Sequence, residues 1–354
     1  MLDRRPTQAD GNEVPWMREN PFGLVGPAAI ALVIAGMLSA CLAAGNRPST
    51  SASQVRPTST GATPGAPWAA SATPTPGAPA TATAPTPAVT ATPWPTVVAL
   101  PTTLPTPLTF EGLEPLFAYN GSLPLGMQVV ASEDDNGATI QEITYAGAAG
   151  ETVEAYLILP VGQGPFPAVL FEPGTGGTRD TFRAEALLLA QNRQIAGLLP
   201  SRPTGLNNGG DDTIEAILQI REMRRGLDLL SAQPQVDPSR LGYQGWSLGA
   251  MYGTILLPVE PRIKTASLMS TVPNGQPESP VMAIMAPHIK TPTLLMQFGL
   301  HDSYYTEAEA DAFAALIPTT HKVSWINAGH DLSDGAGTSV TERAAWLADQ
   351  LAVK

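Results

Sequence analysis

The chain has 354 residues and a formal net charge of −12, from 19 Lys and Arg against 31 Asp and Glu. An acidic surface aids solubility and repels phosphate groups, which argues against nucleic acid and anionic lipid as partners. The single cysteine, Cys41, excludes an intrachain disulfide and excludes thiol catalysis by the residues that follow it.

Residues 1–45 contain an uncharged run, residues 21–45, that is typical of an export signal. Within it, Leu38-Ser39-Ala40-Cys41 resembles the lipobox of bacterial lipoproteins, in which the cysteine is diacylated and becomes the mature N-terminus. The alternative is an uncleaved membrane anchor, because the run is long enough to span a bilayer. The flank before the run departs from a plainly basic signal, since it carries three Arg and four acidic residues. Both interpretations place the rest of the chain outside the cytoplasmic membrane of a bacterial cell, tethered to it.

Residues 46–107 differ in composition from the rest: they hold 14 of the 36 prolines, and most of the others are Thr, Ala, Ser or Gly. Such a segment buries too little apolar surface to offset the entropy of ordering it. We therefore predict a disordered Pro/Thr/Ala-rich linker over 46–107 and one globular domain over 108–354.

Apolar runs rich in β-branched residues predict strands in the globular part, and the periodic segments between them predict helices. The expected strands are Gln141–Tyr145, Val153–Leu159, Pro167–Phe171, Gln194–Leu199, Leu241–Gln244, Thr265–Met269, Thr293–Phe298 and Lys322–Ile326. The expected helices are Thr181–Gln191, one capped by Asp211-Asp212-Thr213 that ends near Ser231, one that begins at or just after Ser247, Glu307–Leu316 and Val340–Leu351. This alternation implies an α/β fold, with a mostly parallel central sheet and helices on both faces.

Ser247 lies in Gly245-Trp246-Ser247-Leu248-Gly249, between a predicted strand and a predicted helix. A turn of this kind is too tight for side chains at Gly245 and Gly249, and it lifts the serine hydroxyl clear of the sheet. In a parallel sheet, ligands bind beyond the carboxyl ends of the strands, which is where Ser247 is expected. The context therefore predicts that Ser247 is a nucleophile.

A serine nucleophile needs a base, and two of the four histidines, His301 and His330, follow predicted strands. His288 and His321 precede strands, so we expect them at the opposite edge of the sheet in ordinary surface roles. We assign His330 as the base, because this choice leaves Asp302 free to act as the acid.

The side chains of an adjacent His-Asp pair point apart, which makes His301 a poor partner for Asp302. In the assigned arrangement Asp302 would orient His330 and stabilise the imidazolium. Asp331 and Glu307 are the alternative acids. A metal site at His301-Asp302 or at His330-Asp331 is not expected, because adjacent residues rarely chelate one ion.

Three segments around these residues resemble α/β-hydrolases, most closely the dienelactone-hydrolase-like and acyl-esterase branch. They are LDLLSAQPQVDPSRLGYQGWSLGAMYG, TPTLLMQFGLHDSYYTEAEADAF and SWINAGHDLS. The likeness extends from Ile140 to the end of the chain, and the order Ser, Asp, His belongs to that fold. It implies hydrolysis of an ester, thioester or amide through an acyl-enzyme, without a metal or organic cofactor. The implied substrate is a small-molecule or polymer ester.

Acyl transfer of this kind uses two backbone N–H groups to hold the developing oxyanion. The resemblance implies Leu248 as one donor and a residue of the loop FEPGTGGTRD as the other. Families of this fold usually begin that loop with His-Gly, whereas this chain has Pro173-Gly174, which makes Thr175 the expected donor.

Trp246 is a second departure, since histidine is frequent at that position. Trp246 and Tyr304 are expected at the substrate pocket, although Trp246 could equally pack under the turn. Tyr305 and Trp325 are weaker choices for the pocket, with core packing as the alternative for Trp325. Residues 273–289 have no clear period, which indicates a small insertion near the site.

Three functions fit these features. The favoured one is a membrane-tethered serine esterase outside the cytoplasm. A serine peptidase or amidase of the same fold is ranked lower, because such peptidases generally carry a large additional N-terminal domain that we do not recognise here. A non-catalytic surface-binding lipoprotein on this scaffold is ranked last, because degenerate scaffolds generally lose a member of the triad, and all three residues are present.

Overall fold

The computed structural model describes residues 96–201, 212–275, 278–334 and 337–352. The strands are β1 (Gln128–Asp135), β2 (Ala138–Ala146), β3 (Thr152–Pro160), β4 (Phe166–Glu172), β5 (Ala196–Pro200), β6 (Val236–Trp246), β7 (Ile263–Met269), β8 (Thr293–Gly299) and β9 (Thr320–Ile326). The α-helices are α3 (Phe110–Leu113), α4 (Arg183–Arg193), α5 (Asp212–Ala232), α6 (Leu248–Leu256), α7 (Ser279–Met285), α8 (Glu307–Leu316) and α9 (Thr338–Gln350). Short 3₁₀ helices are η1 (Glu114–Phe117), η2 (Leu257–Val259) and η3 (Ala286–His288). The predicted signal segment with Cys41 and the predicted linker up to residue 95 lie outside the described residues.

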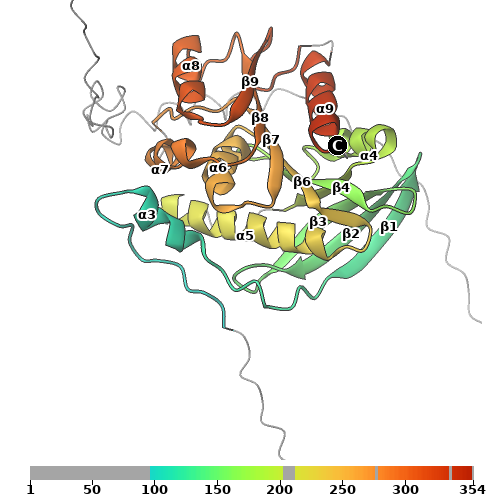
Figure 1. Cartoon of the computed structure of the whole chain (residues 1–354). Helices are drawn as coiled ribbons and strands as arrows, with labels where there is room; N and C mark the ends of the chain where they lie inside the picture. The colour runs from blue at the N-terminus through green and yellow to red at the C-terminus, as the bar shows by residue number, and fades with distance from the viewer. Residues whose placement is uncertain (1–95, 202–211, 276–277, 335–336, 353–354) are drawn as a thin grey trace, which may run out of the picture. The chain divides into compact units, whose positions relative to one another are not determined.

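The strands form one sheet in the order β1-β2-β3-β5-β4-β6-β7-β8-β9 (Figure 1). The part β5-β4-β6-β7-β8-β9 is parallel, whereas β1, β2 and β3 pair antiparallel with their neighbours. The mostly parallel α/β sheet that the sequence predicts is therefore confirmed. Because β4, β6, β8 and β9 are parallel, their carboxyl ends and the loops after them meet at one edge.

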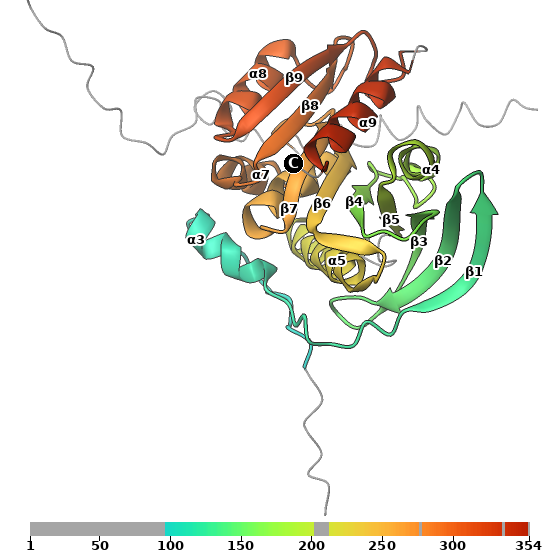
Figure 2. The same cartoon turned by 45° about the vertical axis from the view of Figure 1, so that its right-hand side comes forward.

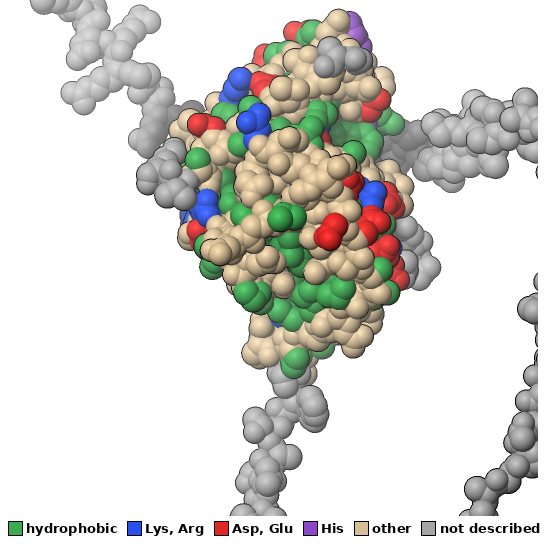
Figure 3. Space-filling view, turned by 90° about the vertical axis from the view of Figure 1, so that its right-hand side faces the viewer, with side chains coloured by type: hydrophobic (Ala, Val, Ile, Leu, Met, Phe, Trp, Pro, Cys, Tyr) green, Lys and Arg blue, Asp and Glu red, His purple; other side chains and the backbone are tan. Residues whose placement is uncertain are grey.

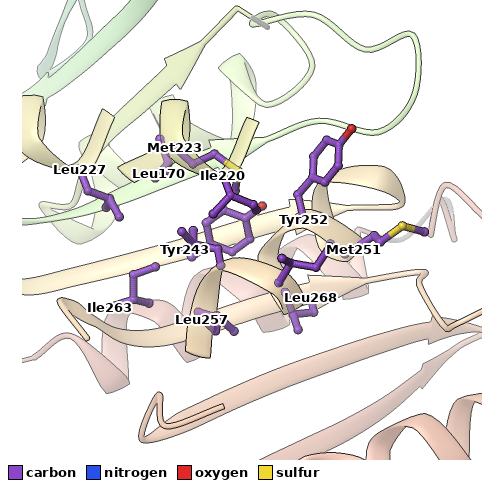
Figure 4. Close-up of a cluster of buried hydrophobic side chains, with 14 of the residues drawn as sticks. Leu170, Ile220, Met223, Leu227, Tyr243, Met251, Tyr252, Leu257, Ile263 and Leu268 are labelled. Atoms are coloured by element: carbon purple, nitrogen blue, oxygen red, sulfur yellow. The ribbon is translucent and has the colours of Figure 1, made fainter. Parts of the chain in front are cut away.

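Helices cover both faces of the sheet (Figure 2). One hydrophobic cluster joins residues of α5, α6, α7 and α8 to sheet residues such as Leu170 and Tyr243. Figure 4 shows part of this cluster, with side chains from α5 and α6 packed on the strands. A second cluster joins α4 and α9 to Val169 and Phe171. Neighbours along β4 enter opposite clusters because successive side chains of a strand point to opposite faces, so this strand is buried on both sides.

Strand β1 and the short helices were missing from the sequence prediction. Nearly every side chain of β1 is exposed, so the strand lacks the apolar alternation by which strands are recognised. It is held through its backbone, in antiparallel register with β2. Residues 273–289, the predicted insertion, contain α7 and η3. Strand β5 starts at Ala196 rather than at Gln194, because Gln194 ends α4 in a left-handed conformation with φ 55°.

Residues 96–107 pack on the globular part, although the sequence places them in the linker. The Arg221 guanidinium of α5 donates to the carbonyl oxygens of Val98, at 2.8 Å, and Ala99, at 3.2 Å. Leu100 and Leu104 pack against the cluster that contains α5. Because these apolar side chains are separated by Pro and Thr, the composition of the segment resembles the linker while its contacts belong to the domain.

No helix within the described ranges is long and apolar enough to cross a membrane. On the face of the molecule shown in Figure 3, Lys and Arg side chains are scattered among uncharged and acidic ones.

Candidate active site

Ser247 occupies the sharp turn between β6 and α6. Its backbone has φ 54° and ψ −118°, a conformation that costs a non-glycine residue on the order of 1–3 kcal/mol. Flanking contacts enforce the turn: a Cβ on Gly245 would lie 2.5 Å from the Gly249 carbonyl oxygen, and a Cβ on Gly249 would overlap the Glu172 carbonyl. The Ser247 N–H donates to the Met269 carbonyl oxygen at 2.8 Å, which ties the turn to the end of β7. The structure thus has the tight turn that Gly245 and Gly249 indicate.

His330 reaches Ser247 from the loop after β9. Its Nε2 lies 2.8 Å from the Ser247 Oγ, across 83 positions of sequence. The neighbouring Ala328 carbonyl oxygen accepts the His301 N–H at 3.0 Å, which joins this loop to the one after β8. The structure therefore brings His330, and not His301, to the serine.

Asp302 lies behind His330, in the loop after β8. Its Oδ2 is 2.7 Å from the His330 Nδ1, and its Oδ1 accepts the Tyr304 N–H at 2.9 Å. The Asp302 side chain is fully buried, and each of its carboxylate oxygens has a donor. This arrangement can hold the imidazole with Nδ1 protonated and Nε2 free to accept the serine proton.

The other acids and histidines lie elsewhere. Asp331 is exposed and accepts the Ser333 N–H at 3.1 Å, and Glu307 is exposed in the first turn of α8. The His301 Nε2 lies 2.8 Å from the Asn327 Oδ1. His288 stacks on Phe110, and the His321 Nδ1 lies 2.9 Å from the Thr319 carbonyl oxygen.

Two tyrosines beside Asp302, Tyr304 and Tyr305, differ in burial and in their contacts. Tyr304 is 58% exposed, and its ring centroid lies 4.5 Å from that of His330. Tyr305 is buried, and its hydroxyl accepts the Gly299 N–H at 3.1 Å. Burial raises the pKa of Tyr305, which keeps its hydroxyl neutral. Tyr304 therefore faces the site, whereas Tyr305 supports the loop from below.

Ser247 and His330 line a cavity of about 530 Å³. Its other lining residues are Thr175, Glu215, Trp246, Leu248, Met251, Tyr252, Ser270, Thr271, Asn274, Glu278 and Tyr304. Both expected oxyanion donors, Leu248 and Thr175, thus belong to the same cavity as the serine, and Leu248 begins α6, whose N-terminal end favours negative charge. Trp246 and Tyr304 line the cavity as expected. Trp325 instead packs on Phe298 at the core, with ring centroids 5.3 Å apart.

The sequence analysis did not name the cavity residues Ser270, Thr271, Asn274 and Glu278, although it expected residues 273–289, which include the last two, near the site. A signal for these residues exists, since they follow β7 and so lie at the same edge as the loops after β6, β8 and β9. Two further lining residues that the sequence analysis did not name, Met251 and Tyr252, lie in the first turns of α6. In the described ranges no group of three or more His, Cys, Asp or Glu side chains is arranged to hold a metal ion.

No family model matches the chain. It is similar to a polyketide transferase of Stachybotrys chlorohalonatus, at 27% identity over 138 residues, which cover 38% of this chain and 45% of the relative. It is also similar to the esterase FrsA of Salmonella newport, at 26% identity over 167 residues, which cover 47% of this chain and 40% of the relative. The chain thus matches less than half of the length of each of these relatives.

Solved structures give the fold. The S-formylglutathione hydrolase from Agrobacterium tumefaciens has a TM-score of 0.54 at 14% identity, covering 64% of this chain and 100% of the hydrolase. A cold-adapted esterase from an Arctic intertidal metagenomic library, in a PEG-bound complex, has a TM-score of 0.54 at 18% identity, covering 63% of this chain and 98% of the esterase. Together with the sheet order and the parallel strands, these likenesses show that the chain has the α/β-hydrolase fold.

Proposed function

We propose that this chain is a serine hydrolase that cleaves carboxylic esters through an acyl-enzyme. One observation carries the proposal: Ser247 Oγ, His330 and Asp302 are joined by contacts of 2.8 Å and 2.7 Å at a cavity. The esterases among the similar proteins support the choice of an ester over another acyl compound.

In the first half of the reaction, His330 Nε2 takes the proton from Ser247 Oγ as the oxygen attacks the ester carbonyl. Asp302 stabilises the imidazolium that forms. The N–H groups of Leu248 and Thr175 would bind the oxyanion of the tetrahedral intermediate, each worth about 3–4 kcal/mol. When the intermediate collapses, His330 gives the proton to the leaving alcohol and the acyl group stays on Ser247.

In the second half, water attacks the acyl-enzyme while His330 again takes a proton. The oxyanion forms in the same place, and its collapse releases the carboxylic acid and returns the proton to Ser247 Oγ. Ser247, in the lining of the cavity, thus serves as nucleophile in the first half and as leaving group in the second.

The test compares hydrolysis of p-nitrophenyl acetate and butyrate by the full chain and by Ser247→Ala. We expect kcat to fall by at least ~10³-fold, because the serine and histidine act as a unit. Ser132→Ala is the matched control: Ser132 is exposed on β1 and its loss should leave the rate unchanged. Turnover by Ser247→Ala at the wild-type rate would contradict the mechanism.

A p-nitroanilide amide in the same assay distinguishes an esterase from an amidase. A wild-type chain that cleaves neither the esters nor the amide would favour a binding protein.

We further propose that the chain is a bacterial lipoprotein held at the outer side of the cytoplasmic membrane through Cys41. The support is the sequence Leu38-Ser39-Ala40-Cys41 after an uncharged run. Mass spectrometry of the exported protein should find a mature chain that begins at a diacylated Cys41, and Cys41→Ala should remain unprocessed. An exported chain with an intact, unacylated Cys41 would favour the uncleaved anchor.

A further inference from the structure

Trp246 contacts three of the chain segments that build the proposed site. It is the last residue of β6 and directly precedes Ser247. Its Nε1–H donates to the His330 carbonyl oxygen at 2.8 Å, and its ring lies 5.6 Å from the imidazole, centroid to centroid. On another side its ring lies against Gly174, where a Cβ would come within 2.7 Å of Cε3. One indole therefore touches the serine turn, the loop after β9 that carries His330 (the histidine loop) and the loop that carries Thr175.

The indole is itself held in place. It packs against the buried cluster of α4 and α9, which includes Phe171 from β4, Met269 from β7, and Ala328 and Leu332 from the histidine loop. A ring wedged between strand ends and loops has few positions open to it, so its N–H can fix the atom it binds.

The Trp246 N–H is one of the contacts that hold the histidine loop in place. Leu332, two residues after His330, has φ 56°, and its N–H donates to the Gly329 carbonyl oxygen at 3.1 Å. The loop is joined to the Asp302 side of the site by the His301 N–H, which donates to Ala328. The bond from Trp246 joins the backbone of His330 itself to the serine side.

We infer that Trp246 is a positioning residue, which acts on the reaction through His330 rather than by recognising the substrate. Its N–H sets the distance between the His330 backbone and the serine turn, and the imidazole can then contact Ser247 Oγ and Asp302 together. Its ring supports Gly174 and, through it, the place of the Thr175 N–H. This inference rests on the proposed function, since it assigns a task within the same reaction.

A positioning role and a pocket role have different kinetic signatures. Loss of positioning lowers the rate of the chemical steps and leaves ester binding nearly intact, whereas loss of a pocket wall changes KM and the preference for acyl length. A misplacement of about 1 Å in a reacting group can cost ~10²-fold in rate.

The inactivation of Ser247 by diisopropyl fluorophosphate offers an independent measure of how well His330 is placed to take the serine proton. In it the Oγ–P bond forms, the P–F bond breaks, and the proton of Oγ passes to His330 as fluoride leaves.

The experiment replaces Trp246 in the full chain in two ways. Trp246→Phe removes the N–H and shortens the ring system, whereas 3-benzothienylalanine at position 246 exchanges only the N–H for sulfur and keeps the shape. Trp346 is the matched control, because its Nε1–H donates to Thr265 Oγ1 at 2.9 Å from α9, outside the cavity lining. The same two replacements are made there.

We expect both Trp246 variants to lose ~10- to 100-fold in kcat for p-nitrophenyl acetate, with KM changed less than ~2-fold. The rate of inactivation by diisopropyl fluorophosphate should fall in parallel. The Trp346 variants should keep both rates and show a similar Tm to the Trp246 variants. If Trp246→Phe does not fold, the benzothienylalanine variant decides.

Two results would overturn the inference. One is an unchanged kcat in the benzothienylalanine variant. The other is a change in KM and acyl preference with an unchanged rate of inactivation, which would make Trp246 a pocket wall. Ser247→Ala separates this failure from that of the proposed function. If Ser247→Ala is inactive while the Trp246 variants keep their rates, only the inference fails; if Ser247→Ala is fully active, both fail.

Discussion

Two buried carboxyl groups, that of Asp302 in the loop after β8 and that of Glu222 on α5, have different hydrogen-bond surroundings. Asp302 receives a donor on each oxygen, from the Tyr304 N–H and from the His330 imidazole. Glu222 of α5 receives the Ala148 and Ala149 N–H groups on Oε1, at 2.7 Å and 3.3 Å. Its second oxygen faces another acid, Glu151, whose carboxyl group is crowded against the same glycine, Gly147.

The consequence appears in the protonation of Glu222. Burial, and then the proximity of the Glu151 carboxyl, raise the pKa of Glu222 to about 9. The pair is crowded against Gly147, where a Cβ would come within 2.5 Å of Glu222 Oε2. A buried carboxyl that faces another carboxyl thus stays neutral at pH 7, whereas one that faces only donors is suited to support an imidazolium. Burial alone does not select a catalytic acid.

The largest effect that separates the two regions is expected at Asp302. Asp302→Asn keeps the shape but presents an amide to His330 Nδ1, which favours the wrong tautomer. We expect kcat for p-nitrophenyl acetate to fall by ~10³-fold or more, with the fold retained by circular dichroism. Asp331→Asn is the matched control, since Asp331 adjoins His330 in sequence but is exposed. A large loss in Asp331→Asn with activity kept in Asp302→Asn would move the role of acid to Asp331.

An intermediate effect is expected at Glu222, on stability rather than on rate. Its pKa is raised in the folded state, so between about pH 5 and 9 the folded chain holds a proton that the unfolded chain has released. The contribution of protonated Glu222 to the free energy of unfolding is therefore complete at low pH and is lost as the pH rises toward 9. Glu222→Gln has no such proton to lose, and its amide oxygen can accept the same N–H bonds. From pH 6 to 9 we expect wild type to lose about 2–4 kcal/mol more in free energy of unfolding than Glu222→Gln.

Urea unfolding at both pH values measures this difference. Glu260→Gln is the control, because Glu260 is equally buried but the Arg262 guanidinium, opposing the effect of burial, holds its pKa below the usual range. Its substitution should destabilise the chain by a similar amount at pH 6 and at pH 9. An identical pH dependence in wild type and Glu222→Gln would show that the folded chain does not retain the proton on Glu222.

The smallest effect concerns one tyrosine from each region. Tyr243 OH donates to the Gly249 carbonyl oxygen at 2.5 Å under the serine turn, whereas Tyr145 OH, near Glu222, has no hydrogen-bond partner within the described ranges. Tyr243→Phe leaves a buried carbonyl short of a donor, which should cost about 1–2 kcal/mol. Tyr145→Phe removes an unsatisfied hydroxyl and should be neutral or slightly stabilising. Thermal unfolding of both variants is the measurement, and a larger loss in Tyr145→Phe would reveal a bond that Tyr145 makes after all.

Much of this fold was predictable because its signals are local. The buried strands carry apolar runs, the long helices carry a periodic apolar face, and the tight turn at Ser247 requires Gly245 and Gly249 whatever surrounds it. Strand β1 gave no such signal, because an exposed edge strand is held by backbone pairing and not by its side chains. Residues 96–107 were misplaced for a similar reason: their contacts with Arg221 use backbone carbonyls, which composition does not reveal.

By itself, the sequence determined the α/β class, the serine turn and the order Ser247, Asp302, His330, since each follows from residue types along a short stretch or from their order. It left Asp331 and Glu307 open as acids and left Trp246 between pocket and packing. Only the tertiary structure placed Asp302 behind His330, set the Trp246 indole on the His330 carbonyl and brought Glu151 next to Glu222. These contacts join segments far apart in the chain, and the direction of each side chain there depends on how its loop is packed.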